Sequence, residues 1–387
     1  MLRGTERFLT THTGSLPRPD DLIAMMVARE EGVPVDEAAL DKRVTAAIGE
    51  MVRLQSEAGV DIVNDGEMSK PSYATYVKDR LNGFGGTGNS FVFQDLVGFP
   101  KSQVRVFGDP GRKTRKTPGC NGPISVRDLK SPKVDVENLT ACAAGAKIEG
   151  LFSSAASPGV ISLFFRNDYY KSHEEYLYAI AEAMRYEYET IAHAGMTLQL
   201  DCPDLAMSRH TGYQALSEAE FLQVAAANVE ALNAATARIA PERMRMHVCW
   251  GNYEGPHDCD IALEKVIGII LRARPATILF EAANPRHEHE WKVWAGARIP
   301  QDKILAPGLI DTCSNYVEHP ELIAQRIERY AGIVGADRVV ASTDCGFGTF
   351  AGYGKIDPGV TWKKLLALRA GADIAAARLG AQAVVTA

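Results

Sequence analysis

Short apolar runs rich in β-branched residues alternate with longer amphipathic stretches along most of the chain, and this alternation restricts the possible folds more than any other feature. It is typical of parallel α/β structures, in which each strand is followed by a helix that covers the sheet. We expect eight principal strands, at Phe8 to Ser15, Val60 to Glu67, Val160 to Phe165, Thr197 to Asp201, Met244 to Cys249, Thr277 to Glu281, Ile304 to Asp311 and Val339 to Cys345. Eight strand–helix units predict an α/β fold of the (β/α)8 TIM-barrel type.

Amphipathic stretches between these runs predict the barrel helices. Examples are Asp36 to Ala58, His173 to Ala194, Ser217 to Ile239, Asp260 to Arg272 and Pro320 to Val334. The chain contains no internal repeat and no low-complexity linker, so we expect residues 1–387 to form a single domain.

One segment interrupts the alternation. Residues 82–148 are rich in Gly, Pro and basic residues and are predicted to be an insertion after strand two, with an extra strand at Cys120 to Ser125. Arg112, Lys113, Arg115 and Lys116 form a basic run within it. The ordinary interpretation of this run is a solvated loop, and the more specific one is a lid that contacts an anion.

Composition excludes several classes of protein. The chain has 387 residues, of which 46% are hydrophobic, a formal net charge of -6 and a pI of about 5.9, so we expect a large core and no binding to nucleic acid or to an anionic membrane. The longest apolar runs are too short to span a bilayer, and the amino terminus lacks the apolar core of a signal peptide. The seven cysteines follow no disulfide framework. We therefore expect a cytoplasmic protein, and the sequence is compatible with a homo-oligomer without specifying one.

A histidine and two cysteines stand where two of the expected strands end. His247 and Cys249 are two residues apart, so in a strand both side chains point to the same side, and Cys345 lies in a later Asp-Cys-Gly turn. Thiolates together with an imidazole select zinc over magnesium or calcium. The alternative is that both cysteines are small buried hydrophobic residues.

Several motifs, in the right order, make the chain resemble the catalytic barrel of cobalamin-independent methionine synthase. They are Thr13-Gly14-Ser15 with the following Leu16-Pro17, Gly66-Glu67, Leu200-Asp201-Cys202-Pro203, His247 with Cys249, Glu281, and the turn around Cys345. In that family His247, Cys249, Glu281 and Cys345 would be the ligands of a Zn²⁺ cofactor. The resemblance implies a zinc-dependent methyltransferase that activates homocysteine as a zinc thiolate, attacks a methyl donor and gives methionine.

The resemblance also implies how the acceptor is held. Ser15, Glu67 and Asp201 stand where the family binds the carboxylate and ammonium of homocysteine. Two carboxylates beside a thiol site favour an acceptor with an ammonium group and disfavour a sulfonate such as coenzyme M. Thr13, Phe165 and Arg166 complete the expected substrate contacts, since they lie at the ends of expected strands one and three.

Two features that serve methyltetrahydrofolate in the family differ here. Ser162 to Arg166 replaces a Trp-Ser region beside the pterin, and Asp311-Thr312-Cys313 replaces a turn that carries a proton-donating histidine. A thiol of ordinary pKa is a poorer acid than imidazolium near neutrality. We expect Glu281 to act as the most displaceable ligand and Asp311 and Cys313 to lie at the donor side. The donor itself stays open between methyltetrahydrofolate, a methylcorrinoid and a sulfonium.

Three alternatives remain at this point: a thiol transferase or lyase of the epoxyalkane–coenzyme M transferase type, a barrel like uroporphyrinogen decarboxylase, and a metal-binding barrel without catalysis. Two further runs, His257-Asp258-Cys259 and His287-Glu288-His289, have spacings like those of metal ligands. They fall in expected loops, and we interpret them as polar clusters on the surface.

Overall fold

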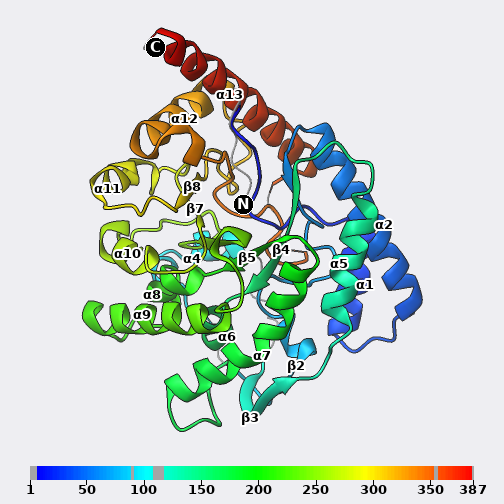
Figure 1. Ribbon diagram of the computed structural model, residues 1–387. Coiled ribbons are helices and arrows are strands. Elements are labelled where there is room, and N and C mark those ends of the chain that lie inside the picture. Colours follow the sequence, from blue (N-terminus) through cyan, green and yellow to red (C-terminus); the bar gives the residue numbers. More distant parts are fainter. Residues whose placement is uncertain (1–6, 89–90, 108–116, 353–355, 386–387) are drawn as a thin grey trace.

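A ring of parallel strands surrounded by helices makes up most of the computed structural model, which describes residues 7–88, 91–107, 117–352 and 356–385 (Figure 1). The strands are β1 Ile62–Val63, β2 Leu81–Gly85, β3 Gly119–Val126, β4 Gly150–Ala156, β5 Thr197–Asp201, β6 Met244–Val248, β7 Thr277–Phe280 and β8 Ile304–Pro307. The helices are α1 Asp20–Glu30, α2 Glu37–Glu57, α3 Val77–Arg80, α4 Pro100–Phe107, α5 Ser131–Cys142, α6 Pro158–Phe164, α7 His173–His193, α8 Ser208–Thr211, α9 Glu218–Ala235, α10 Leu263–Ile270, α11 Trp291–Gly296, α12 Pro320–Val334 and α13 Pro358–Val385.

Six of the strands form one parallel sheet in the order β1-β4-β5-β6-β7-β8. Two further extended segments continue it: Thr11 forms a parallel bridge with Ile62 of β1, Thr10 forms one with Ala341, and the segment around Ala341 pairs in turn with β8. Eight extended segments therefore meet in a closed ring, and the predicted α/β fold of the TIM-barrel type is confirmed.

The interior of this ring combines an apolar layer with a buried cation. Leu9, Ile62, Phe152 and Leu279 belong to one buried cluster, and the guanidinium of Arg245 lies 3.4 Å from the centre of the Phe152 ring. Arg245 is on β6, two residues before His247, so the inward side of that strand leads from Arg245 to His247 and then to Cys249. Charged and metal-binding side chains thus lie on top of a packed core, at the carboxyl ends of the strands.

The prediction for strand three was wrong. Val160 to Phe165 lies in helix α6, and the strand that fills this place in the sheet is β4, Gly150–Ala156. The apolar, β-branched run resembled a strand because it is completely buried. The helix begins there because the side chain of Ser157 accepts a hydrogen bond from the N–H of Val160 and Pro158 occupies the first turn.

The expected barrel helices are present, and all end within a few residues of the predicted positions. Helices α2, α7 and α12 match closely, whereas α9 and α10 are shorter than predicted. Local capping explains the sharp starts, since Ser172 and Ser217 each accept a hydrogen bond from a first-turn N–H of the helix that follows.

Residues 82–148 contain both new structure and part of the barrel. The predicted extra strand is confirmed as β3, which pairs antiparallel with β2 and packs beside α7 at the edge of the molecule (Figure 1). Helix α5 packs against α2 and α7 and therefore belongs to the outer ring. The basic run from Arg112 to Lys116 lies outside the described residues.

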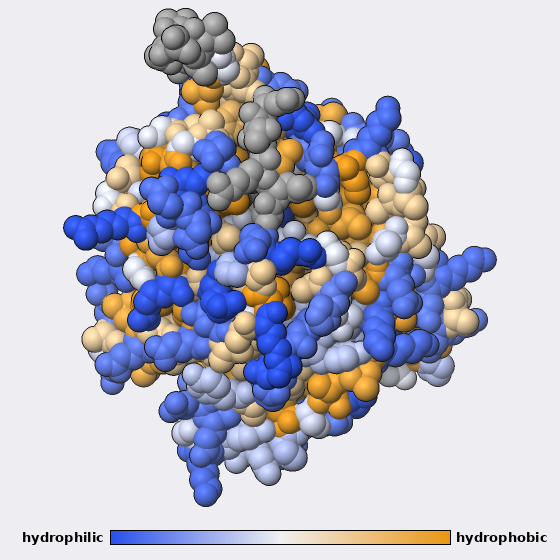
Figure 2. All heavy atoms as spheres, in the orientation of Figure 1, coloured by the Kyte–Doolittle hydropathy of each residue, from blue (hydrophilic) through white to orange (hydrophobic). Residues whose placement is uncertain are grey.

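The visible surface is mixed in character. On the face shown in Figure 2, hydrophobic residues form scattered patches among hydrophilic ones. Among the residues that the structure describes, none of the helices combines the length and the apolar character that crossing a membrane requires.

Candidate functional site

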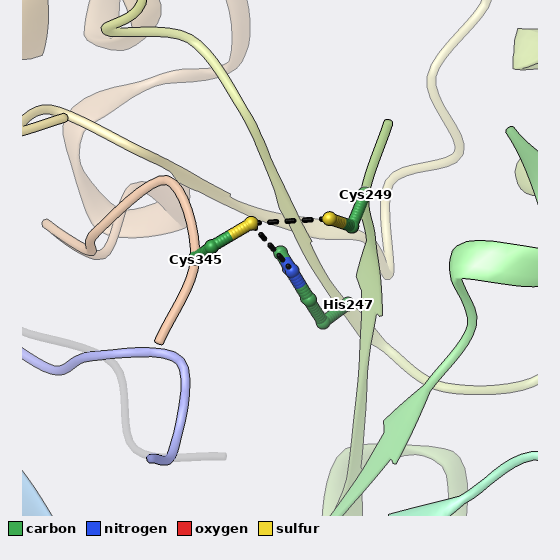
Figure 3. Close-up of side chains that lie close together, drawn as sticks. All are labelled: His247, Cys249 and Cys345. Carbon is green, nitrogen blue, oxygen red and sulfur yellow. Dashed lines mark hydrogen bonds between the residues drawn. The ribbon is translucent and has the colours of Figure 1, made fainter. Parts of the chain in front are cut away.

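His247, Cys249 and Cys345 converge at the carboxyl end of the barrel (Figure 3). The two sulfur atoms are 3.1 Å apart, and the Sγ atom of Cys345 is 3.5 Å from Nε2 of His247. Strand β6 ends at Val248 and places His247 and Cys249 on one side, while Cys345 comes from the turn after the closing segment. All three residues are buried.

Glu281 lies next to these three ligand atoms. Its Oε1 atom is 3.7 Å from Sγ of Cys345 and accepts a hydrogen bond of 2.7 Å from the N–H of Trp250. Its Oε2 atom accepts a hydrogen bond of 2.6 Å from the side-chain amide of Asn284. The carboxylate is therefore held from two loops and faces the sulfur atoms. We call His247, Cys249, Glu281 and Cys345 the thiol site.

The distances fit ligands that share one ion. Zn–S bonds of about 2.3 Å and Zn–N bonds of about 2.0–2.1 Å place tetrahedral ligands about 3.8 Å apart for two sulfurs and about 3.5 Å apart for sulfur and nitrogen. The S–N separation in the protein is 3.5 Å and the S–S separation is 3.1 Å. A shift of well under 1 Å of one cysteine side chain completes the fit, so the residues present suit zinc.

Burial keeps His247, Cys249 and Cys345 uncharged in the protein alone. Desolvation and the charge of Arg245 lower the pKa of His247 to about 3, so its imidazole is neutral, the form that binds a metal. The hydrogen bond to Cys345 acts to lower the pKa of Cys249, but burial and the charge of Glu281 outweigh it and raise that pKa to about 11. Burial also raises the pKa of Cys345 well above its ordinary value. A cation in the site must therefore displace thiol protons.

Glu67 and Asp201 form a buried acidic pair beside the thiol site. Burial raises the pKa of both groups, and for Asp201 the charge of Glu67 raises it further. Glu67 Oε1 accepts a hydrogen bond of 2.8 Å from Ser154, whereas its Oε2 atom is buried without a hydrogen-bond partner in the described structure. Two such carboxyls suit a cationic ligand, because a nearby ammonium stabilises the charged form of both.

The backbone at Glu67 is strained in the way that functional positions often are. Its φ angle is +60°, a left-handed conformation that residues other than glycine rarely adopt. The N–H of Glu67 donates to the Asp65 carboxylate, and the Arg18 guanidinium donates to the Glu67 carbonyl. These contacts turn the Glu67 side chain toward the barrel axis, where its carboxylate meets Ser154 of β4.

Ser15 and Thr13 are both buried near this pair, with different partners. The hydroxyl of Ser15 accepts a hydrogen bond from the N–H of Gly348 and packs against Gly346, where an added Cβ would lie 2.0 Å from it. Thr13 donates its hydroxyl to the carbonyl of Thr343, so it ties the first segment to the one that carries Cys345. A substrate contact by either residue stays a prediction.

The structure places the expected donor-side residues in two different surroundings. Asp311 accepts a hydrogen bond from the N–H of Cys313, whose thiol is 3.2 Å from Oδ1 of Asn252, and burial raises the pKa of that thiol well above its ordinary value. Phe165 is completely buried and stacks on Phe84 at 4.3 Å between ring centroids.

Arg166 is half exposed and pairs with Asp168. Phe165 and Arg166 therefore lie apart from the acidic pair and the thiol site, and their contact with substrate stays a prediction.

Two aromatic residues, Tyr73 and Phe350, were missed from the sequence, and they pack together with Phe164. Tyr73 packs edge-on against Phe164 and Phe350, with centroids 5.8 Å away in both cases. Burial raises the pKa of Tyr73 well above its ordinary value, and the charges of Cys249 and Asp201 raise it further. Tyr73 and Phe350 lie in loops and Phe164 ends helix α6, so no local pattern links the three rings in the sequence.

The interpretation of the other two histidine runs as surface clusters was wrong for His257 and His287. His257 and His287 are largely buried, and both contact Asp260, whereas His289 is exposed. This contact could not be predicted locally, because helix α10 and strand β7 separate His287 from His257 and Asp260 along the chain.

Comparisons with known proteins show which proteins this chain is similar to. The chain matches the family described as "Cobalamin-independent synthase, Catalytic domain" over residues 8–101 and 158–353. It is 23% identical over 340 residues to a methionine synthase of Sulfolobus acidocaldarius, with 87% of this chain and 85% of the relative covered. It is 24% identical over 373 residues to a methionine synthase of Thermococcus kodakarensis, with 94% and 92% covered.

Solved structures show the same fold. A B12-independent methionine synthase from Shewanella sp. W3-18-1, in complex with selenomethionine, is similar with a TM-score of 0.72 and 21% identity, and the match covers 97% of this chain and 99% of that one. A putative vitamin-B12-independent methionine synthase from Listeria monocytogenes gives a TM-score of 0.65 and 19% identity, with 96% and 99% covered.

Proposed function

The chain belongs to the cobalamin-independent methionine synthase family, and from this membership we propose that it is a zinc-dependent methyltransferase that transfers a methyl group to the thiol of homocysteine and forms methionine. The observation that carries the proposal is the convergence of His247, Cys249 and Cys345 within ligand distance of one another, with Glu281 beside them. This set of ligand atoms, two sulfurs, one nitrogen and one oxygen, favours zinc.

Zinc held by these four residues would lower the pKa of an acceptor thiol and keep the resulting thiolate nucleophilic at neutral pH. The protein residues contribute position and surroundings. Trp250 and Asn284 fix the Glu281 carboxylate from two sides, and burial excludes water from the sulfur atoms. In the transfer, the acceptor sulfur forms a bond to the methyl carbon while the bond from that carbon to the donor breaks and its electron pair leaves with the donor.

The acidic pair supports an amino acid as the acceptor. Glu67 and Asp201 are buried and lie close enough that the charge of one raises the pKa of the other. An acceptor with an ammonium group relieves this repulsion, whereas a sulfonate thiol adds to it. We therefore propose homocysteine, with Ser15, Glu67 and Asp201 as its contacts, ahead of coenzyme M.

The donor side supports a methyl donor whose leaving group needs no proton. Cys313 donates its S–H toward Asn252, and burial raises its pKa well above the ordinary value, so it is a weak acid in this position. When a sulfonium or a methylcorrinoid is the methyl donor, its leaving group departs without being protonated. Asp311, which fixes the Cys313 backbone, would then shape the turn without giving up a proton itself.

We also propose that residues 1–387 act as one domain in which part of the 82–148 segment forms a lid. The described stretch from Phe91 to Phe107 lies against the loops that follow β5 and β6: Gln214 donates to the Val92 carbonyl, and Tyr253 donates to Asp95. This stretch therefore contacts the loop that continues from Cys249 through Tyr253.

The direct experiment combines metal content with turnover. Purified protein is expected to contain one zinc per chain and to form methionine from homocysteine with a methyl sulfonium or a methylcorrinoid as donor. A protein that takes up no zinc, or that methylates coenzyme M in preference to homocysteine, would overturn the proposal in favour of a decarboxylase-like barrel or a coenzyme M transferase, respectively.

A further inference from the structure

Three histidines from three loops surround one buried carboxylate outside the thiol site. His210 Nδ1 lies 3.2 Å from Asp260 Oδ1, and His257 Nδ1 and His287 Nε2 each lie 2.9 Å from Asp260 Oδ2. His210 is in α8 after β5, His257 follows β6, and His287 follows β7. We call these four residues the Asp260 cluster. It joins the loops that follow three neighbouring strands.

Hydrogen-bond geometry fixes the charge of two of these histidines. Both ring nitrogens of His287 face carboxylate oxygens, since Nδ1 is 2.9 Å from Glu290 Oε2 and Nε2 is 2.9 Å from Asp260 Oδ2. His257 likewise directs Nδ1 to Asp260 and Nε2 to the carbonyl of Tyr253. A ring in which both nitrogens face acceptors is an imidazolium, because both must donate.

The pKa values agree with this assignment. Burial acts to lower the pKa of His287, but hydrogen bonds to Asp260 and Glu290 outweigh it and raise the pKa to about 10. The same balance raises the pKa of His257 through its hydrogen bond to Asp260. His257 and His287 therefore form buried ion pairs with Asp260 at neutral pH, whereas burial lowers the pKa of His210.

The contacts of the Asp260 cluster lead to one ligand of the thiol site. The His287 ring lies 4.3 Å from the ring of Trp250, at an interplanar angle of 32°. The N–H of Trp250 donates to Glu281 Oε1, and its indole N–H donates to the Ile261 carbonyl, next to Asp260. On the other side of Glu281, Asn284 holds Oε2 and its carbonyl accepts from the N–H of His287.

Trp250 and Asn284, which both donate to Glu281, thus each contact His287. We propose that the Asp260 cluster is a positioning assembly that fixes the Glu281 carboxylate against Cys249 and Cys345 and thereby sets the affinity of the thiol site for zinc. This inference rests on the proposed zinc-dependent function. Residues that hold a metal ligand in place typically change metal affinity by about 10- to 100-fold when they are replaced.

The test measures zinc affinity in competition with a chromophoric chelator for the full-length protein and for Asp260→Asn. The control is His289→Gln, which changes an exposed histidine of the loop that carries His287. We expect Asp260→Asn to bind zinc about 10- to 100-fold more weakly. We also expect the visible absorption of the cobalt(II)-substituted protein to change, because the carboxylate ligand is displaced. His289→Gln should match the natural protein in both measurements.

A second variant covers the case in which Asp260→Asn does not fold. His287→Gln removes the stack on Trp250 and both ion pairs of that ring, but leaves Asp260 in contact with His257. A role in stability alone would lower the melting temperature of these variants and leave zinc affinity and the cobalt spectrum of the folded protein unchanged, which would overturn the inference. If the natural protein itself takes up no zinc, the proposed function fails and this inference fails with it.

Discussion

The thiol site and the Asp260 cluster are built from similar residues in neighbouring loops, yet their side-chain nitrogen and sulfur atoms face different partners. In the Asp260 cluster both ring nitrogens of His257 and of His287 lie within 3.0 Å of an oxygen atom, whereas Nδ1 of His210 has no hydrogen-bond partner in the described structure. In the thiol site the Sγ atom of Cys345 faces another thiol at 3.1 Å and an imidazole nitrogen at 3.5 Å. Thiols are weak hydrogen-bond donors, so these contacts leave the metal-binding atoms available.

Whether a nitrogen or sulfur atom can bind a metal thus depends more on its present partner than on the residue type. Asp260 and Glu290 occupy the nitrogens of His287, so that ring cannot also bind a metal. Among the residues that the structure describes, His247, Cys249 and Cys345 are the one group close enough to share an ion. If only the thiol site binds zinc, replacing residues of the two groups should have different consequences.

Removing one thiol of the thiol site should have the largest effect. Cys345→Ser is expected to lower zinc affinity on the order of 10²- to 10³-fold, because one of four ligand bonds is lost, and to abolish methyl transfer. Elemental analysis after dialysis measures the loss. The matched control is Cys259→Ser, a free thiol in the loop of the Asp260 cluster, which should keep its zinc. Equal zinc content in both variants would show that Cys345 is not a zinc ligand.

The second prediction concerns Cys313, a thiol near the thiol site whose S–H already faces an acceptor, Asn252. Without a general acid beside the methyl donor, methyltetrahydrofolate should be a poor substrate, since general acid catalysis raises a reaction rate on the order of 10²- to 10⁴-fold. Cys313→His is expected to recover part of this factor for methyltetrahydrofolate and to leave the rate with a sulfonium donor nearly unchanged. Efficient turnover of methyltetrahydrofolate by the natural protein would show that Cys313 matters little.

The third prediction separates the acceptor contacts from the metal ligands. Asp201→Asn removes one charge of the acidic pair and should weaken homocysteine binding by about 10- to 100-fold, the equivalent of roughly 1–3 kcal/mol for a desolvated charge contact. Zinc content should not change, because Asp201 makes no contact with the ligand atoms in the described hydrogen bonds. Isothermal titration with homocysteine measures the effect, and an unchanged affinity would remove Asp201 from the acceptor site.

The smallest expected effect is a pH dependence of stability that arises in the Asp260 cluster. The pKa of His287 is raised from its ordinary value near 6.5 to about 10 by the two carboxylates, so its contribution to stability is complete below pH 6.5 and is lost as the pH rises toward 10. Between pH 7 and pH 9 the natural protein should lose on the order of 1–2 kcal/mol relative to His287→Gln. Urea unfolding at each pH measures this difference, and a constant difference would mean that His287 is not charged.

Much of the thiol site could be predicted from the sequence because local rules position it. Alternation along a strand puts His247 and Cys249 on one side, and the carboxyl end of the next strand supplies Glu281. Cys345 was also found at the end of an expected strand, and the resemblance to a family then joined all four residues into one set of ligands. The barrel followed from the alternation of strands and helices in the same way.

The parts of the fold and of the Asp260 cluster that could not be predicted depend on contacts between residues far apart in the sequence. Strand β4 consists largely of Gly, Ser and Ala, whereas the apolar run that resembled a strand is a buried helix. His210, His257 and His287 meet at Asp260 only after three loops fold over the barrel. Such contacts between loops decide which polar groups are buried and paired, and the spacing of residues along the chain does not reveal them.

The most direct test of the account is zinc K-edge X-ray absorption of the natural protein, with and without homocysteine. The account predicts two sulfur atoms at about 2.3 Å from zinc, with nitrogen and oxygen neighbours at about 2.0–2.1 Å. It further predicts a third sulfur when homocysteine is added. A zinc environment without sulfur, or one with two sulfurs that does not change with homocysteine, would contradict the claim that the thiol site binds zinc in order to activate a thiol.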